Sequence, residues 1–145
     1  MTETLKRFLK PVGQSINSSA ALLLLRLVVG IAFVMHGSGK IQNPFGWMGP
    51  QATIPGFFQF LAAISEFGGG VAWILGFMTP LASLGIGCTM AVAVRMHVMV
   101  FKDPFVNLTG GSSYESALVY FCLAILFLVV GCGKFSVDAK LFGER

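Results

Sequence analysis

Four long apolar stretches restrict this chain to folds in which helices cross a lipid bilayer. They lie at about 18–36, 57–77, 81–100 and 114–131, and each approaches the roughly 20 residues that a helix needs to cross the hydrocarbon core. Apolar residues make up 55% of the 145 residues and charged residues only 11%, whereas a soluble domain usually carries about 25% charge. The excess apolar surface has to face lipid, so we predict an all-α, integral membrane four-helix bundle.

Two polar segments flank the predicted membrane domain at 18–133: an N-terminal segment at 1–17 and a tail at 134–145. Lys and Arg gather in these two segments, whereas the loops at 37–56 and 101–113 carry one lysine each. Basic residues concentrate on the cytoplasmic side of membrane proteins. We therefore predict that both termini are cytoplasmic and that the first apolar stretch is a retained helix rather than a cleaved signal peptide.

Four charged residues interrupt the predicted spans: Arg26, Glu66, Arg95 and Glu115. A charge near the centre of a bilayer costs about 2.5–3.5 kcal/mol on insertion scales, so each needs compensation. Counted from the expected outer ends of their helices at about 1.5 Å per residue, Arg26 and Glu66 lie at equal depth. Arg95 and Glu115 both fall in the outer third. We therefore predict two ion pairs, Arg26–Glu66 and Arg95–Glu115, or one network of four charges inside the bundle.

Further polar and aromatic residues on the same helices complete the set of candidates. Trp73 shares a glycine-rich helix face with Glu66, and small residues on such a face let another helix approach closely. Two histidines without a carboxylate cluster make a poor metal or haem site, so no metal is predicted. The polar core either fixes helix register or also lines a ligand site. The candidate polar-core and ligand-binding residues are Arg26, Glu66, Arg95, Glu115, His36, Lys40, Trp73 and His97.

Composition and motifs argue against several other functions. The net charge of +4 comes without a basic stripe interleaved with aromatic residues, so we predict no nucleic-acid partner. Cys88, Cys122 and Cys132 lie in apolar runs without a CxxC pair, and we expect buried small side chains rather than disulfides or metal ligands. We find no phosphate-binding glycine loop and no nucleophile–base–acid arrangement, and we predict no covalent cofactor.

Three segments, in order along the chain, carry a resemblance to a known family. The first is Leu25-Arg26-Leu27 with Gly30, Phe33, His36-Gly37 and Lys40. The second is Glu66-Phe67-Gly68-Gly69-Gly70 with Leu75-Gly76 and Thr79-Pro80. The third is Glu115-Ser116-Ala117-Leu118 with Tyr120, Gly131, Gly133, Phe135-Ser136 and Asp138. Over about residues 20–140 the chain resembles the DoxX family of small four-helix bacterial membrane proteins.

The resemblance implies a multi-pass protein of the bacterial cytoplasmic (inner) membrane. The family is named for a subunit of an archaeal thiosulfate:quinone oxidoreductase, and its relatives include membrane partners of redox and thiol-stress systems. It therefore implies a membrane subunit of a quinone-linked oxidoreductase or a thiol/oxidative-stress system, with a quinone as ligand and oxidoreductase subunits as partners. Whether the chain itself catalyses a reaction stays open.

Two alternatives remain open beside this interpretation. The same arrangement of charges within apolar helices suits a small-solute transporter or permeation unit. It also suits a structural or assembly membrane protein without chemistry of its own. Four short helices form a small bundle in contact with the lipid bilayer, which is compatible with a homo-oligomer or a larger complex.

Overall fold

The computed structural model describes residues 3 and 8–144 and contains only helices within that part of the chain. Its elements are α2 (Ile16–Gln42), α3 (Gly56–Leu75), α4 (Thr79–Arg95), the π-helix η1 (Met96–Phe101) that continues α4, α5 (Glu115–Val130) and the short α6 (Val137–Phe142). Three of these segments, α2, α3 and α4 with η1, are long and apolar enough to cross a membrane, and α5 is a shorter apolar helix. The predicted all-α membrane architecture is confirmed at this level.

The first membrane helix is longer than the sequence suggested. It begins after the N-cap residue Ser15, whose hydroxyl accepts a hydrogen bond from the Ser18 amide at 3.1 Å. It then continues through His36 and Gly37 to Gln42 instead of ending at the glycines. Gly37 is buried against α3, where an added Cβ would lie 2.5 Å from the Phe67 nitrogen. Close packing and the need to satisfy backbone hydrogen bonds in lipid thus override the weak helix preference of glycine.

The connection between α3 and α4 is a short turn with left-handed backbone. Gly76 has a φ of 64°, and its N–H reaches the carbonyl groups of Ala72 and Trp73, which ends α3. Met78 also has positive φ, at 48°, and α4 begins directly after it at Thr79. Pro80 lies in the first turn of α4, where its missing N–H costs no helical hydrogen bond.

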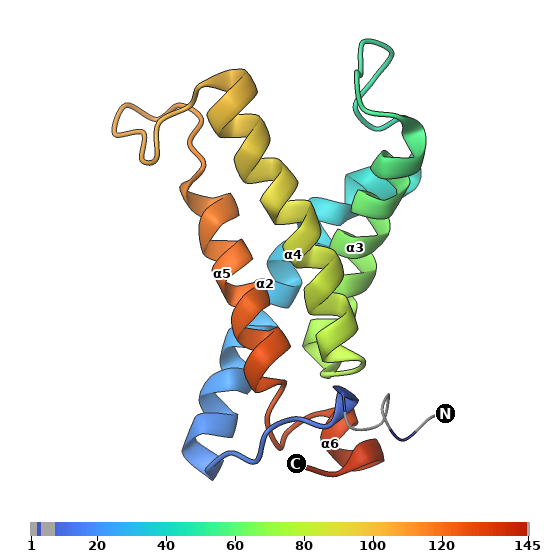
Figure 1. Cartoon of the computed structure of the whole chain (residues 1–145), viewed down its shortest axis with the longest axis vertical. Helices are drawn as coiled ribbons and strands as arrows, with labels where there is room; N and C mark the ends of the chain where they lie inside the picture. The colour runs from blue at the N-terminus through green and yellow to red at the C-terminus, as the bar shows by residue number, and fades with distance from the viewer. Residues whose placement is uncertain (1–2, 4–7, 145) are drawn as a thin grey trace.

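The helices form two antiparallel pairs that meet along part of their length. α2 packs most extensively on α3, and α4 packs most extensively on α5. The two pairs join through α3 and α4, which lie together near α6 and diverge toward the opposite end (Figure 1). Residues 8–15 and α6 lie together at the end where α3 and α4 meet, which we call the α6 end. The end where α3 and α4 diverge is called the open end.

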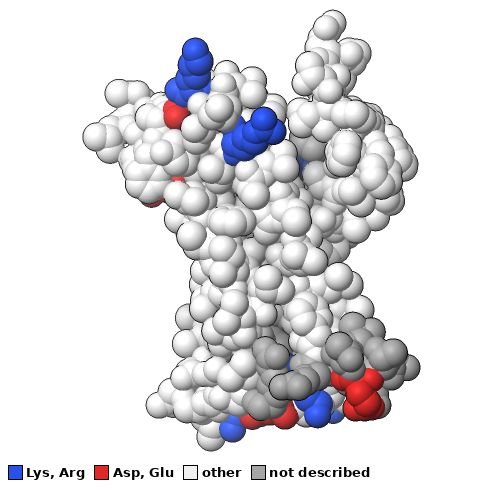
Figure 2. Space-filling model, viewed as in Figure 1, with Lys and Arg blue, Asp and Glu red and all other residues white. Residues whose placement is uncertain are grey.

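Aromatic side chains fill the centre where the two pairs meet. Trp73 is fully buried, and its ring packs edge-on against Phe33 at 5.5 Å and Phe127 at 4.8 Å between centroids. The buried cluster as a whole consists of Val29, Phe33, Trp73, Ile86, Met90, Ala117, Ala124 and Phe127. On the face seen in Figure 2, charged side chains gather at the two ends and leave the middle uncharged, as a bilayer-spanning surface requires.

Glycines at the crossing of α2 and α3 set the separation of these two helices. A Cβ on Gly70 would lie 2.8 Å from the Gly30 oxygen and 2.8 Å from the Val34 nitrogen. Both are backbone atoms that cannot rotate away. We predict that Gly70→Ala lowers the free energy of unfolding by about 1–3 kcal/mol, as overpacking usually does.

The matched control for this substitution is Gly68→Ala on the same helix. A Cβ there would meet only Ile64 Cγ2 at 3.9 Å, so this variant should be as stable as the native chain or slightly more stable. Thermal unfolding in detergent micelles, followed by circular dichroism, compares the two. Equal melting temperatures for both variants would contradict the packing argument.

Candidate functional site

The most buried acidic side chain of a membrane helix pairs with a lysine near the open end of the bundle. Glu66, in the middle of α3, has a side chain only 3% exposed. Its two carboxylate oxygens accept hydrogen bonds from Lys40 Nζ at 2.5 and 2.6 Å. Lys40 lies in the last turn of α2, and its side chain is 25% exposed. The pair therefore has a buried carboxylate and an ammonium group that can be reached from outside.

The loop between α2 and α3 folds over the lysine. Lys40 Nζ lies 4.5 Å from the centroid of the Trp47 ring, a cation–π contact that stabilises the ammonium group where water is scarce. Gln59 is buried and holds the loop in place with three hydrogen bonds. Trp47 Nε1 donates to the Gln59 carbonyl at 2.9 Å, the Met48 amide donates to Gln59 Oε1 at 3.0 Å, and Gln59 Nε2 donates to the Ile54 carbonyl at 2.8 Å.

Two further polar side chains, His36 and Tyr120, contact each other one helical turn before Lys40 along α2. His36 is exposed and precedes Lys40 by one helical turn, so both lie on the same face of α2. Its ring centroid is 6.4 Å from that of Tyr120 on α5, and Tyr120 in turn packs against Phe33 at 4.9 Å. Lys40 directs two hydrogen bonds to Glu66 and has a third N–H available. These groups can donate hydrogen bonds to a polar ligand.

The predicted pair of Arg26 and Glu66 is wrong. Arg26 is fully buried at the α6 end, where Nη1 donates to the Cys132 carbonyl at 2.6 Å and Nη2 donates to the Phe135 carbonyl at 3.0 Å. Because α2 continues past His36 to Gln42, Arg26 lies about 24 Å from the open end of its helix, whereas Glu66 lies about 15 Å from the start of α3. A Cβ on Gly76 would lie 2.6 Å from Arg26 Nη1, and Gly76 is about 15 Å along α3 from Glu66.

A buried carboxylate near the C-terminus organises the α6 end. Asp138 is fully buried and accepts hydrogen bonds from the backbone amides of Met78 at 2.7 Å and Thr79 at 2.9 Å. It therefore caps the N-terminus of α4 from another part of the chain. Cys132 Sγ lies 3.6 Å from Asp138 Oδ2, and burial raises the pKa of this thiol, which keeps it protonated as a donor. No local pattern marks Asp138 as a cap, since the capped helix begins about sixty residues earlier.

The other predicted site residues do not come together. Arg95 and Glu115 are both exposed and form no ion pair with each other, so the second predicted pair is also wrong. His97 Nδ1 bonds Asp103 Oδ2 at 2.7 Å near the end of η1. Trp73 is a core residue whose Nε1 donates to Ser83 Oγ at 3.0 Å.

The cysteines differ from expectation in their exposure. Cys132 is buried as expected, whereas Cys88 and Cys122 are exposed on the outer faces of α4 and α5. All three are free. Among the described residues, no group of three or more His, Cys, Asp and Glu side chains could hold a metal ion.

The pairing of Lys40 with Glu66 predicts how substitutions of these two residues combine. Lys40→Met or Glu66→Met alone should lower the free energy of unfolding by about 1–3 kcal/mol, because each leaves a charged partner without its hydrogen bonds. The double variant should lose clearly less than the sum of the two. Denaturant titration in detergent micelles measures these differences.

Arg26→Met provides the comparison for this pair of single variants and their double variant. Arg26 and Glu66 share no partner, so Arg26→Met combined with Glu66→Met should be additive within about 0.5 kcal/mol. If the effects of Arg26→Met and Glu66→Met on the free energy of unfolding are coupled, or those of Lys40→Met and Glu66→Met are additive, the Lys40–Glu66 pair is contradicted.

The capping of α4 by Asp138 leads to a separate prediction. Asp138→Ala should lower the free energy of unfolding by about 1–2 kcal/mol, because two backbone amides of α4 lose their acceptor. Asp103→Ala, which removes a more exposed partner of His97, should cost about 1 kcal/mol or less. Melting temperatures in the same detergent compare them, and an equal or larger effect at Asp103 would count against the capping role.

Comparisons with known proteins agree with this architecture. The family model described as DoxX matches residues 21–101. An uncharacterized protein of Haemophilus influenzae is 30% identical over 123 residues, which cover 83% of this chain and 90% of that protein. The "Inner membrane protein YqjF" of Escherichia coli is 29% identical over 126 residues, with 83% and 91% covered. The "Putative oxidoreductase CatD" of Bacillus subtilis is 29% identical over 99 residues, with 67% and 70% covered.

No solved structure matches the chain significantly. The family match covers more than half of the chain, and the Haemophilus and Escherichia relatives align with most of it. The matched region contains most of α2 and all of α3, with Lys40 and Glu66, and it extends to the end of η1. The chain belongs to the DoxX family and is a multi-pass protein of the bacterial inner membrane.

Proposed function

We propose that this protein is a membrane subunit of a quinone-linked oxidoreductase system and that a quinone ring binds beside the Lys40–Glu66 pair. The observation that carries the proposal is an ion pair with a buried carboxylate and a partly exposed ammonium group, covered on one side by the Trp47 ring. The name of the Bacillus subtilis relative, "Putative oxidoreductase CatD", supports the same class of function.

The chemistry of a quinone suits these groups. Quinone carbonyls accept hydrogen bonds, and the third N–H of Lys40, the His36 ring and the Tyr120 hydroxyl are donors in this region. The Trp47 ring offers an aromatic face beside Lys40. Reduction of a quinone to a quinol consumes two electrons and two protons. We assign the electrons to a partner subunit and the binding and proton exchange to Lys40 and Glu66.

The permeation alternative requires a cavity that reaches the intramembrane charges. Two grooves among the described residues lie on the two sides of α4, and their linings include neither Lys40 nor Glu66. These two grooves therefore do not supply such a path. A purely structural role for the pair makes a different prediction from ligand binding, and the experiment below separates the two.

Tryptophan fluorescence can test quinone binding directly. The chain has two tryptophans, Trp47 and Trp73, so Trp73→Phe leaves Trp47 as the reporter 4.5 Å from Lys40 Nζ. Adding ubiquinone or menaquinone analogues to this variant in lipid nanodiscs should quench its emission saturably. Lys40→Met in the same background should weaken binding about tenfold or more, since a hydrogen bond from a charged donor is lost.

The control is Lys140→Met, which removes an exposed lysine on α6 at the far end of the bundle. It should bind the quinone as the parent does. If Lys40→Met lowers the melting temperature but leaves quenching unchanged, the pair is structural and the quinone site is rejected.

A further inference from the structure

The connection between η1 and α5 contains a surface loop, residues 104–114, whose apolar side chains are exposed. Leu108 is 93% exposed, and Phe105 and Val106 are 50% and 42% exposed. The loop has no charged residue, and it projects sideways from the α4–α5 pair, away from α3 (Figure 1). We propose that the 104–114 loop inserts the side chains of Phe105, Val106 and Leu108 into the lipid leaflet at the open end of the bundle.

The polar groups of this loop, in contrast, are used inside it. Asn107 Oδ1 accepts hydrogen bonds from the Thr109 amide at 3.0 Å and from the Thr109 hydroxyl at 2.7 Å. Asn107 Nδ2 donates to the Ser112 carbonyl at 3.2 Å. The Tyr114 amide donates to the Pro104 carbonyl at 3.3 Å, which closes the base of the loop. Apolar groups outside and polar groups inside are typical of a surface that contacts a membrane or another protein.

The lengths of the neighbouring helices place the loop at the surface of the hydrocarbon core. α5 has 16 residues, about 24 Å, whereas α4 with η1 has 23 residues, about 34 Å. One end of each lies near α6 (Figure 1), so η1 ends about 10 Å farther from α6 than α5 does. Glu115 is exposed in the first turn of α5, and a lipid-exposed carboxylate belongs at headgroup level. The loop therefore returns from η1 to the boundary between headgroups and hydrocarbon.

A lipid leaflet fits this surface better than a partner protein does. The rim of a protein interface is polar, whereas the exposed side chains at the start of this loop are apolar and uncharged. Phe105 packs against Tyr114 with 5.4 Å between ring centroids, and aromatic rings gather at headgroup level. Val119, one turn into α5, is 49% exposed and continues the apolar surface toward the bilayer centre. Because an irregular backbone cannot lie in the hydrocarbon itself, the side chains of the loop enter it and the backbone does not.

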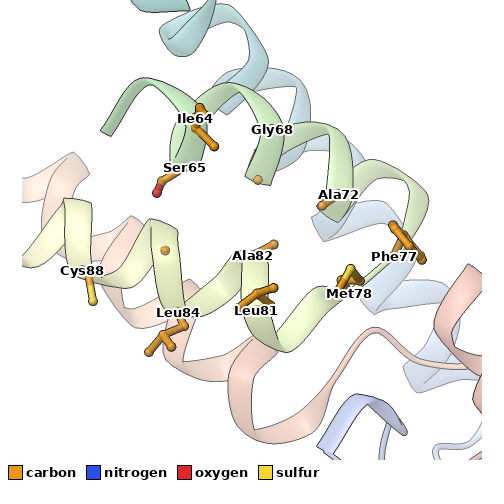
Figure 3. A pocket seen from close by; sticks show the side chains of 12 residues that line it. Ile64, Ser65, Gly68, Ala72, Phe77, Met78, Leu81, Ala82, Leu84 and Cys88 are labelled. Atoms are coloured by element: carbon orange, nitrogen blue, oxygen red, sulfur yellow. The ribbon is translucent and has the colours of Figure 1, made fainter. Parts of the chain in front are cut away.

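Spin labelling can measure the depth of the loop in nanodiscs. Cys88, at the groove between α3 and α4 (Figure 3), and Cys122 are the two exposed native thiols, and Cys132 is buried. In a Cys88→Ser, Cys122→Ser background, Leu108→Cys therefore provides one accessible thiol for a nitroxide label. Molecular oxygen concentrates in the hydrocarbon and a nickel chelate stays in water, so power saturation with each reagent reports whether the label lies in lipid.

The label at position 108 should be more accessible to oxygen than to the nickel chelate. The matched control is Ser112→Cys in the same background, because Ser112 is an exposed polar residue of the same loop. Its label should show the reverse preference. Equal oxygen-to-nickel ratios at the two positions, or a label at 108 that prefers nickel, would overturn the inference. A label at 108 that is shielded from both reagents, or is broadened by a second label, would mean that protein covers the loop and would also overturn it.

A second pair of variants tests whether the native side chains hold the loop in the leaflet. Val106→Asp adds a charge to the side that we place in lipid, so it should shift the ratio of the label at 108 toward nickel. Ser112→Asp adds the same charge on the side that we place in water, and it should leave that ratio unchanged. Both positions are exposed, so neither substitution disturbs the core. If the two variants give the same ratio, the inference fails.

Discussion

Placing one carboxylate inside a bundle of apolar helices is the constraint on which the rest of this structure depends. Glu66 is almost fully buried, and its charge is balanced by Lys40, which reaches it from the last turn of α2. This contact is possible only because α2 continues past His36 and Gly37. A shorter first helix would leave Glu66 without a partner at a depth where an unpaired charge is costly. The ion pair, the length of α2 and the covering loop are therefore one arrangement.

The two ends of the bundle differ in how their polar groups are satisfied. At the α6 end, Arg26 and Asp138 are fully buried, and each binds backbone groups of a distant segment. These contacts tie the chain after α5 to α2 and to the start of α4. At the open end, the ammonium group of Lys40 stays partly exposed beside an aromatic ring.

Glycines serve different purposes on the two sides of α3. Gly70 faces α2 and allows the two backbones to approach closely, which a Cβ would prevent. Gly68 faces away from the core, and its missing side chain widens the groove beside α4. The same run of three glycines thus supports both the close packing of α3 on α2 and the open groove beside α4.

The sequence by itself determined the membrane class and the helical architecture, because the length of the apolar stretches follows from composition and spacing. It also marked Glu66 as the residue that needs compensation. It could not determine which side chains pair with these charges. The predicted pairing by depth assumed that the first helix ends at its glycines. Only the packing of Gly37 against Phe67 shows that the helix continues. Asp138 acts on α4 across about sixty residues of chain. Which charges meet depends on helix register, and register is decided by contacts between segments that are distant in the sequence.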